Sequence, residues 1–331
     1  MAIGLVITVR NERSMLRSNL LYHRFLGVEH MWVFDDGSDD GTSETIADLS
    51  NVERRDTVNP DDFNSRPELA DVVRRFHAHV TARQALNTVQ AMEEARAAGC
   101  DWLLAIDADE LVALDLDEAV PGSLPLMFEQ VPGPIEAVRF RTLEVVQRRL
   151  AYGDVLVEET LFKRPDRRAT RETYDPFARK TSRIPVLYGH SEGKMAVRLS
   201  VDAIPYTPHR FVRRTGGRLR ASALGFLLHY YCHDFEAFVS KFQLMRDHPD
   251  RHLRGTRVAL QKRLWRDVVN RSGMDEGELE EYYRRWVMFD EPTIDRLSRT
   301  SRILGRARPS PLVEVRSAQQ AIESLGRADT R

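Results

Sequence analysis

The chain has 331 residues, of which 42% are hydrophobic, 8% aromatic and 30% charged. This is the composition of a globular protein with a substantial core, and it excludes disordered, collagen-like and disulfide-rich proteins. No apolar run is long enough to span a bilayer, and the first ten residues do not resemble a secretion signal. Cys100 and Cys232 form neither a zinc pattern nor a disulfide framework, so we expect a cytoplasmic protein.

The formal net charge of -1 hides two halves of opposite sign. Residues 1–130 carry 24 acidic and 11 basic side chains, whereas residues 131–331 carry 26 acidic and 38 basic ones. An acidic half suggests carboxylates gathered around a metal, and a basic half suits phosphates or a membrane surface. Solvated helix faces would give the same asymmetry, and on charge alone this simpler explanation comes first.

Strand-like and helix-like segments alternate over the first 110 residues. The hydrophobic pattern predicts strand, helix, strand, helix and strand over residues 3–9, 14–26, 31–34, 71–98 and 102–106. This alternation predicts an α/β fold with a doubly wound parallel sheet, in which ligands bind at the carboxyl ends of the strands. Polar segments follow three of the strands at those ends, namely Asn11-Glu12, Asp35 to Thr42 and Asp107 to Glu110.

The pattern changes after Pro132. Shorter strands are predicted over residues 137–144, 156–163 and 195–199, followed by helices over 235–246, 258–270 and 275–289. The tail after Arg306 is rich in Arg, Ser and Pro, and we expect it to be loose apart from a short amphipathic helix within residues 313–325.

Two acidic segments carry the chemistry that the sequence suggests. In the acidic cluster, residues 107–110, Asp107 and Asp109 follow a buried strand and offer the oxygen ligands that Mg²⁺ or Mn²⁺ prefers when it bridges a diphosphate. In the acidic turn, residues 35–42, glycines permit a tight backbone, and carboxylates can accept hydrogen bonds from a base and a ribose. Helix capping explains either segment without a ligand, with Asp40 or Thr42 as the N-cap in the acidic turn.

In order and spacing, these motifs resemble the nucleotide-sugar half of family 2 type glycosyltransferases with the GT-A fold. The resemblance rests on Asn11-Glu12 after the first strand, Phe34 to Thr42 after the second, and Trp102 to Glu110. The version with Tyr22 to His30 and the sequence Asp-Ala-Asp-Glu is similar to the branch related to glycosyltransferase family 92. The resemblance covers about 110 residues and says little about the sugar or the acceptor.

The resemblance implies a fold and a division of the chain. The expected fold is a GT-A type, Rossmann-like mixed and mostly parallel sheet flanked by helices, with a C-terminal helical extension. A glycosyltransferase domain would span residues 1–245, with a nucleotide-sugar half over 1–130 and an acceptor half over 131–245. Residues 246–331 would form the C-terminal helical region with its loose tail.

The resemblance also implies roles for individual residues. The expected ligands of the nucleotide sugar are Asn11, Glu12, Asp35, Asp36, Arg83, Gln84, Asp107 and Lys194. The expected ligands of a Mn²⁺ or Mg²⁺ cofactor are Asp107, Asp109, His229 and, after these, His209. A solvated helix face explains Arg83 and Gln84 equally well, and a histidine beside an apolar run is more often a hydrogen-bonded core residue than a ligand.

Inverting transfer needs a carboxylate base within hydrogen-bond reach of the acceptor hydroxyl. Here the sequence departs from the better-known family 2 enzymes, because it has no Glu-Asp pair in the usual Gly-rich setting. The candidates for the base are Asp154, Glu158, Glu159 and Glu192, and surface charge explains any one of them.

The function expected from these motifs is metal-dependent transfer of a sugar from a nucleotide-diphosphate sugar to a glycan, polysaccharide or lipid-linked acceptor. A nucleotidyltransferase would need a Gly-rich basic loop after the first strand, which Thr8 to Arg13 does not provide. A phosphatase would place its Asp-x-Asp pair after the first strand rather than a later one. A catalytically silent binding protein stays open because the base is unassigned.

The basic half of the chain raises the question of further partners. A nucleic-acid partner is not expected, because the first half is acidic. Contact with the inner face of a membrane is an open expectation for a cluster of arginines, Arg213, Arg214, Arg218 and Arg220.

Overall fold

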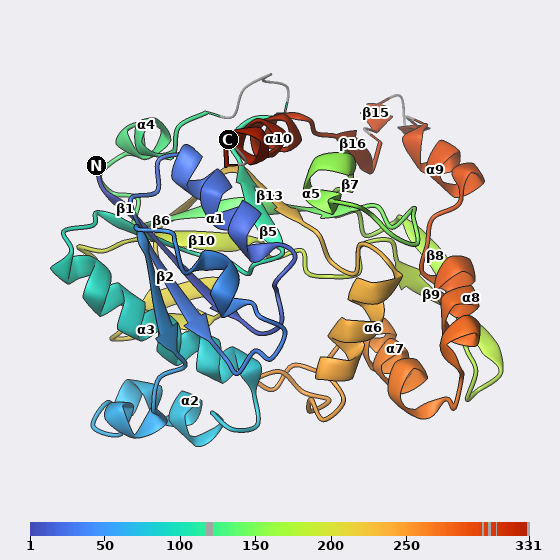
Figure 1. Ribbon diagram of the computed structural model, residues 1–331, viewed down its shortest axis with the longest axis horizontal. Coiled ribbons are helices and arrows are strands. Elements are labelled where there is room, and N and C mark those ends of the chain that lie inside the picture. Colours follow the sequence, from blue (N-terminus) through green and yellow to red (C-terminus); the bar gives the residue numbers. More distant parts are fainter. Residues whose placement is uncertain (117–121, 300, 304–305, 309, 330–331) are drawn as a thin grey trace.

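The computed structural model describes residues 1–116, 122–299, 301–303, 306–308 and 310–329. Within these residues a central sheet of ten strands is flanked by helices, and further helices stand beside it (Figure 1). The strands of the sheet are β1 (Ile3–Val9), β2 (His30–Asp35), β3 (Val52–Asp56), β4 (Trp102–Ala105), β5 (Glu110–Ala113), β6 (Ala137–Val145), β7 (Leu161–Lys163), β10 (Lys194–Arg198), β13 (Ala221–His229) and β16 (Leu312–Glu314).

The remaining strands form small two-stranded sheets in the described part of the chain. They are β8 (Thr170–Asp175) with β9 (Lys180–Pro185), β11 (Ala203–Thr207) with β12 (Arg210–Arg213), and β14 (Ser301–Ile303) with β15 (Arg306–Arg308). The helices are α1 (Leu16–Phe25), α2 (Ala70–Arg74), α3 (Val80–Ala97), α4 (Leu124–Glu129), α5 (Val155–Glu158), α6 (Phe235–Leu244), α7 (Leu260–Arg271), α8 (Glu276–Trp286), α9 (Glu291–Ser298) and α10 (Ser317–Asp329), with short 3-10 turns at η1 (Ser43–Ile46), η2 (Pro60–Phe63) and η3 (Pro67–Leu69).

The first half of the chain builds the parallel part of the sheet, in the order β4-β1-β2-β3. Strand β1 is apolar along most of its length, and successive side chains of a strand point to opposite faces. Leu5 and Ile7 therefore pack with Leu20 of α1, whereas Val6 packs with Met92 of α3. Helices on both faces and a parallel sheet between them are the layers expected from the sequence pattern.

The second half adds antiparallel strands. Strand β10 pairs antiparallel with β4 and β6, and β13 pairs parallel with β6 and antiparallel with β5. In the register between β13 and β5, His229 lies opposite Glu110. This pairing places the end of β13 next to the acidic cluster, although the two segments lie far apart in the sequence.

The C-terminal part contributes a second core and then returns to the central sheet. Aromatic residues of α6, α7 and α8, including Phe238, Trp265 and Tyr283, pack with Tyr188. Strand β16 pairs with β7, and α10 packs beside α1 and α5 (red in Figure 1). The expected mixed α/β sheet flanked by helices, with helices after it, is confirmed.

Some predicted elements have different limits. The single helix expected over residues 71–98 is divided into α2 and α3, because His79 is extended and forms the N-cap of α3. The strand expected over residues 156–163 starts as α5, since Asp154 caps a helical turn by accepting a hydrogen bond from the Leu156 backbone N–H. The tail forms β16 and then α10, and residues 309, 330 and 331 of the tail expected to be loose lie outside the described residues.

Among the described residues, none of the helices has both the length and the apolar character needed to cross a bilayer.

Candidate active site

The acidic turn follows β2 and is held by its own hydroxyl and backbone groups. The carboxylate of Asp35 accepts hydrogen bonds from the Ser38 backbone N–H (2.8 Å) and from the Ser43 hydroxyl. Burial raises the pKa of Asp35, but these hydrogen bonds outweigh it and hold the pKa below its ordinary value. The carboxylate of Asp40 is held in the same way by Thr42, whose backbone N–H lies 2.9 Å from Oδ1. Both carboxylates are therefore ionised acceptors at neutral pH.

The end of β1 is tied to the acidic turn. Asn11 has a left-handed backbone (φ 57°), and its backbone N–H donates to Ser38 Oγ (3.0 Å) while its side chain exchanges hydrogen bonds with Asp39. The backbone N–H of Glu12 donates to Thr42 Oγ1 (2.9 Å). Burial, reinforced by the charge of Asp109, raises the pKa of the Glu12 carboxyl to about 8. The electrostatic coupling of Glu12 to Asp109 indicates that the ends of β1 and β4 lie close together.

A hollow opens beside the acidic turn. It is lined by Asp35, Ser38, Asp39, Gly41, Thr42, Ser43, Glu44, Arg54 and Asp56. Its volume is about 230 Å³, and most of its lining is polar. The expected nucleoside ligand Asp35 therefore lines this hollow. Asn11 is hydrogen-bonded to two of the lining residues, Ser38 and Asp39.

Two consecutive residues of α3 connect the acidic turn with the acidic cluster. Arg83 Nε donates to both carboxylate oxygens of Asp36, at 2.7 and 2.8 Å. Gln84 Nε2 donates to Asp107 Oδ1 at 2.9 Å. The structure thus brings the candidate residues Asp36, Arg83, Gln84 and Asp107 together along one helix terminus, although the ion pair with Asp36 already occupies the Arg83 guanidinium.

The aspartates of the acidic cluster are each paired with a lysine from the second half of the chain. Lys194 Nζ lies 2.7 Å from Asp107 Oδ2, and Lys241 Nζ lies 2.8 Å from Asp109 Oδ2. Burial raises the pKa of Asp109, but Lys241 and His229 outweigh this effect and hold the pKa well below its ordinary value. Both aspartates are ionised, and the two ammonium groups at the same place can hold an anion such as a diphosphate.

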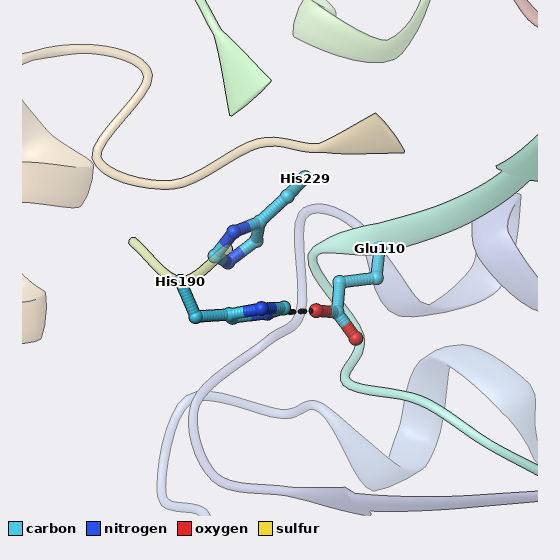
Figure 2. A group of neighbouring side chains, drawn as sticks. All are labelled: Glu110, His190 and His229. Atoms are coloured by element: carbon cyan, nitrogen blue, oxygen red, sulfur yellow. Dashed lines mark hydrogen bonds and ion pairs between the residues drawn. The ribbon is translucent and has the colours of Figure 1, made fainter. Parts of the chain in front are cut away.

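Glu110, His190 and His229 lie close together near these aspartates, and Figure 2 shows the three side chains. His190 Nε2 lies 2.7 Å from Glu110 Oε1, and His229 Nε2 lies 3.6 Å from Asp109 Oδ2. Burial raises the pKa of Glu110 to about 7, and burial together with the neighbouring imidazoles of His209 and His229 holds the pKa of His190 well below its ordinary value. The histidine is therefore neutral at pH 7.

His209, the further metal candidate, lies at the same place. Its ring is tilted by 43° to that of His190, with centroids 4.1 Å apart, and its Nδ1 lies 3.1 Å from the Gly193 carbonyl. Burial and the charge of Lys194 lower the pKa of His209 to about 3. The structure therefore gathers three imidazoles, His190, His209 and His229, beside the acidic cluster.

Helix α1 supports the acidic cluster from below. The side-chain amide of Asn19 donates to the carbonyls of Ala108 and Glu110, both at 2.8 Å. The hydroxyl of Tyr22 donates to the Val112 carbonyl (2.7 Å), and the Val112 backbone N–H donates to His23 Nε2 (3.3 Å). These three buried polar side chains fix the backbone on which Asp107 and Asp109 stand. Tyr22 and His23 belong to the motif that carried the resemblance, and here they have a positioning role.

The four base candidates are not gathered at the acidic cluster. Asp154 caps α5, and Glu158 accepts from the Gly153 and Asp154 backbone N–H groups and pairs with Arg149. Glu159 is buried and accepts from Arg148 and Tyr152. Glu192 is exposed, lies 3.8 Å from Arg210, and stands in the loop between His190 and Lys194. Glu192 is thus the candidate whose loop adjoins the site.

Sequence reasoning missed three residues of this site, namely Glu110, His190 and Lys241. Glu110 ends a motif in which the two aspartates are the expected metal ligands. His190 lies in the segment from His190 to Lys194, in which Glu192 is a candidate for the base. Lys241 lies on a predicted helix, where a lysine is usually solvated. Its pairing with Asp109 depends on the packing of α6 against the sheet.

Comparisons with known proteins give a partial match. No protein-family model matches the chain. The chain is 25% identical over 235 residues to a glycosyltransferase-like protein of Arabidopsis thaliana, an alignment that covers 67% of this chain and 52% of the relative. The chain therefore spans about half the length of this relative.

Solved structures give weaker likenesses. A mycobacterial protein matches with a TM-score of 0.34 and 14% identity, covering 75% of this chain and 76% of the other. The glucosyl-3-phosphoglycerate synthase of Mycobacterium tuberculosis, in complex with Mn²⁺, uridine diphosphate and phosphoglyceric acid, matches with a TM-score of 0.27 and 17% identity, covering 48% and 46%. TM-scores this low carry no argument about the present chain.

Proposed function

We propose that the protein is a metal-dependent glycosyltransferase of the GT-A type, which moves a sugar from a nucleotide-diphosphate sugar to a hydroxyl of a glycan, polysaccharide or lipid-linked acceptor, with inversion. The observation that supports the proposal is that the parallel strands β1, β2 and β4 end at one edge of the sheet, where Lys194 and Lys241 pair with Asp107 and Asp109. A nucleoside would lie in the hollow at Asp35, and its diphosphate at the two ammonium groups. The glycosyltransferase-like relative supports the same assignment.

The residues beside the acidic cluster fit a divalent cation. The carboxylates of Asp107 and Asp109 are hard oxygen ligands, and His229 Nε2 lies 3.6 Å from Asp109 Oδ2. We propose Asp107, Asp109 and His229 as the residues that hold Mn²⁺ or Mg²⁺, with His209 next to them. When bound, the cation would neutralise negative charge on the diphosphate leaving group.

The chain's own residues supply the rest of the proposed chemistry. Lys194 and Lys241 would stabilise the charge that develops on the departing diphosphate, because the neighbouring aspartates outweigh desolvation and hold the pKa of both ammonium groups above its ordinary value. Of the four carboxylates considered as the base, we propose Glu192, since its loop also carries His190 and Lys194. Glu192 would accept the proton of the acceptor hydroxyl as the new glycosidic bond forms.

The first experiment asks whether the protein binds a donor. A panel of nucleotide sugars is tested with Mn²⁺ by thermal shift, and the melting temperature should rise most for the true donor because ligand binding stabilises the native state by mass action. Slow release of nucleoside diphosphate from that donor should fall at least a hundredfold in Asp109→Asn. If no nucleotide diphosphate binds a well-folded sample in the presence of Mn²⁺, the proposal is wrong.

A catalytically silent nucleotide-sugar-binding protein is the second candidate, and one observation favours it. Three of the four base candidates make contacts away from the acidic cluster, and Glu192 is exposed. The experiment above separates the two candidates. Donor binding with equal and negligible release by the wild type and by Asp109→Asn would favour the silent protein, whereas release that depends on Asp109 favours the enzyme.

The cellular setting of the acceptor is part of the proposal. We propose a cytoplasmic protein that contacts the inner membrane face peripherally through its basic surface. Of the four arginines considered for this contact, Arg218 and Arg220 have exposed positions. Arg213 pairs with Glu136, and Arg214 pairs with Glu68 and Asp202, so these two contribute less free positive charge.

A further inference from the structure

Three potential metal ligands come together from three separate parts of the chain (Figure 2). Glu110 begins β5, His190 lies in the loop before β10, and His229 ends β13. One ligand atom from each lies within 4.8 Å of the others. Glu110 and His229 are buried and the side chain of His190 is 14% exposed, so the group is shielded from bulk water but still reachable.

The carboxylate of Glu110 is already oriented. Its Oε2 accepts a hydrogen bond from the Asp107 backbone N–H (2.8 Å) and lies 3.4 Å from Lys194 Nζ. Its other oxygen, Oε1, is therefore the one directed at His190 Nε2. The ammonium of Lys194 is shared with Asp107, so the charge of Glu110 is only partly compensated.

The two imidazoles are also prepared as ligands. Thr142 Oγ1 lies 3.3 Å from His190 Nδ1 and can support the ring from behind, as an outer hydrogen bond does for many metal-bound histidines. His229 Nδ1 is buried with no hydrogen-bond partner in the described chain, an uncompensated cost for a polar atom. Gly189 keeps this space open, because a Cβ at that position would come within 2.7 Å of His229 Nδ1.

We propose that Glu110, His190 and His229 form a binding site for a divalent transition-metal ion that prefers imidazole nitrogen, such as Zn²⁺ or Co²⁺, over Mg²⁺. Two histidines and one glutamate with an open position are an established ligand set for zinc. Tetrahedral bonds of about 2.1 Å place ligand atoms about 3.4 Å apart, so small side-chain movements suffice. With the ion on Nε2, His190 would carry its proton on Nδ1, and this N–H would donate a hydrogen bond to Thr142 Oγ1. This inference goes beyond the proposed function, because the ion would bind without a nucleotide and without sugar transfer.

The test is a titration of the full chain, stripped of metal with a chelator, with CoCl₂ in the absence of nucleotide. Visible absorption of the bound Co²⁺ and isothermal calorimetry are read out together. With the site proposed at Asp107 and Asp109 filled by excess Mg²⁺, we expect one Co²⁺ per chain with the absorption of a four- or five-coordinate ion, and at least tenfold weaker binding in His190→Ala and in Glu110→Gln. Excess Mg²⁺ should not displace the Co²⁺.

Control variants make the result specific. His252→Ala removes a half-buried histidine of a different group, close to His248, and should leave Co²⁺ binding unchanged. Thr142→Val keeps all three ligands and should weaken binding about tenfold through the lost outer hydrogen bond. Metal-free melting temperatures show whether each variant folds. Unchanged Co²⁺ binding in folded His190→Ala, or no Co²⁺ binding by the wild type, would overturn the proposal.

These outcomes are independent of the proposed enzyme activity. Failure of nucleotide binding would leave the Co²⁺ titration interpretable, since that titration contains no nucleotide. Equally, absent Co²⁺ binding at Glu110 and His190 would leave the roles proposed for Asp107 and Asp109 open to their own test.

Discussion

The two acidic segments of the site neutralise their charge in opposite ways. In the acidic turn, Asp35 and Asp40 are satisfied mainly by hydroxyl and backbone groups no more than eight residues away, and Asp40 accepts one further hydrogen bond from the Arg13 backbone N–H, 27 residues away. In the acidic cluster, Asp107 pairs with a lysine 87 residues away and Asp109 with one 132 residues away. The turn is therefore held by its own residues and by the end of β1, whereas the cluster depends on the packing of the second half of the chain.

Because of this difference, we expect the loss of one contact to destabilise the acidic cluster more than the acidic turn. Hydrogen bonds in an exposed turn contribute about 1 kcal/mol each, and water replaces them when they are lost. An unpaired charge in a buried cluster has no such substitute, and removal of one partner of a buried ion pair costs about 3–5 kcal/mol. Four predictions test this contrast, beginning with the largest expected loss of stability.

The largest effect is expected for Lys194→Met. Lys194 is 1% exposed and is the ammonium partner of both Asp107 and Glu110. Its loss leaves the buried Glu110 and the partly exposed Asp107 without their cation, so the free energy of unfolding in urea should fall by about 3 kcal/mol. Lys180→Met, on the exposed strand β9, is the matched control. If Lys194→Met lowers the free energy of unfolding by less than 1 kcal/mol, the cluster tolerates an unpaired carboxylate as well as the turn does.

A smaller loss of about 2 kcal/mol is expected for Asn19→Ala. The variant leaves the buried carbonyls of Ala108 and Glu110 without their donor. Because the same carbonyls belong to the acidic cluster, Mn²⁺-dependent donor binding should weaken as well. Asn64→Ala removes an exposed amide bound to Asp61 and should change neither quantity. Unfolding and nucleotide titration together decide whether α1 positions the cluster.

The third prediction concerns pH. The pKa of Glu12 is raised from 4.5 to about 8, so between these values the folded protein binds more protons than the unfolded chain and its stability falls as the pH rises. Glu12→Gln lacks this proton. The variant should therefore gain stability relative to the wild type from about pH 4.5 to pH 8, by more than the 1.4 kcal/mol that corresponds to one pKa unit. Urea unfolding at four pH values measures the difference, and parallel curves would contradict it.

The smallest effect is expected in the acidic turn. Asp39 is exposed, and its carboxylate accepts one hydrogen bond from Asn11 (2.9 Å). Asp39→Asn should lower the free energy of unfolding by less than 0.5 kcal/mol, because water replaces the contact. The binding of a nucleoside diphosphate is the more sensitive measurement for this position. A stability loss above 1 kcal/mol would place the turn in the same class as the cluster.

The same contrast explains what the sequence could predict. The strands, the order of the polar motifs and the convergence of Asp36 and Asp107 follow from hydrophobic period and from the rule that parallel strands end at one edge. The pairing of Lys194 and Lys241 with the two aspartates, and the place of His190, could not be predicted, since no local pattern pairs residues that are 87 or 132 positions apart. The helix break at His79 and the short α5 were missed because capping and tertiary packing decided them.

The return of the chain to the sheet at β16 has a consequence for biosynthesis. Strand β7 gains its outer partner only when residues 312–314 have left the ribosome, and the contact between Thr160 and Glu314 joins positions 154 residues apart. Until then the edge of the growing sheet can pair with other nascent chains. Substitutions that weaken the pairing of β7 with β16 would therefore reduce the yield of folded protein during translation far more than they alter the candidate active site of the folded protein.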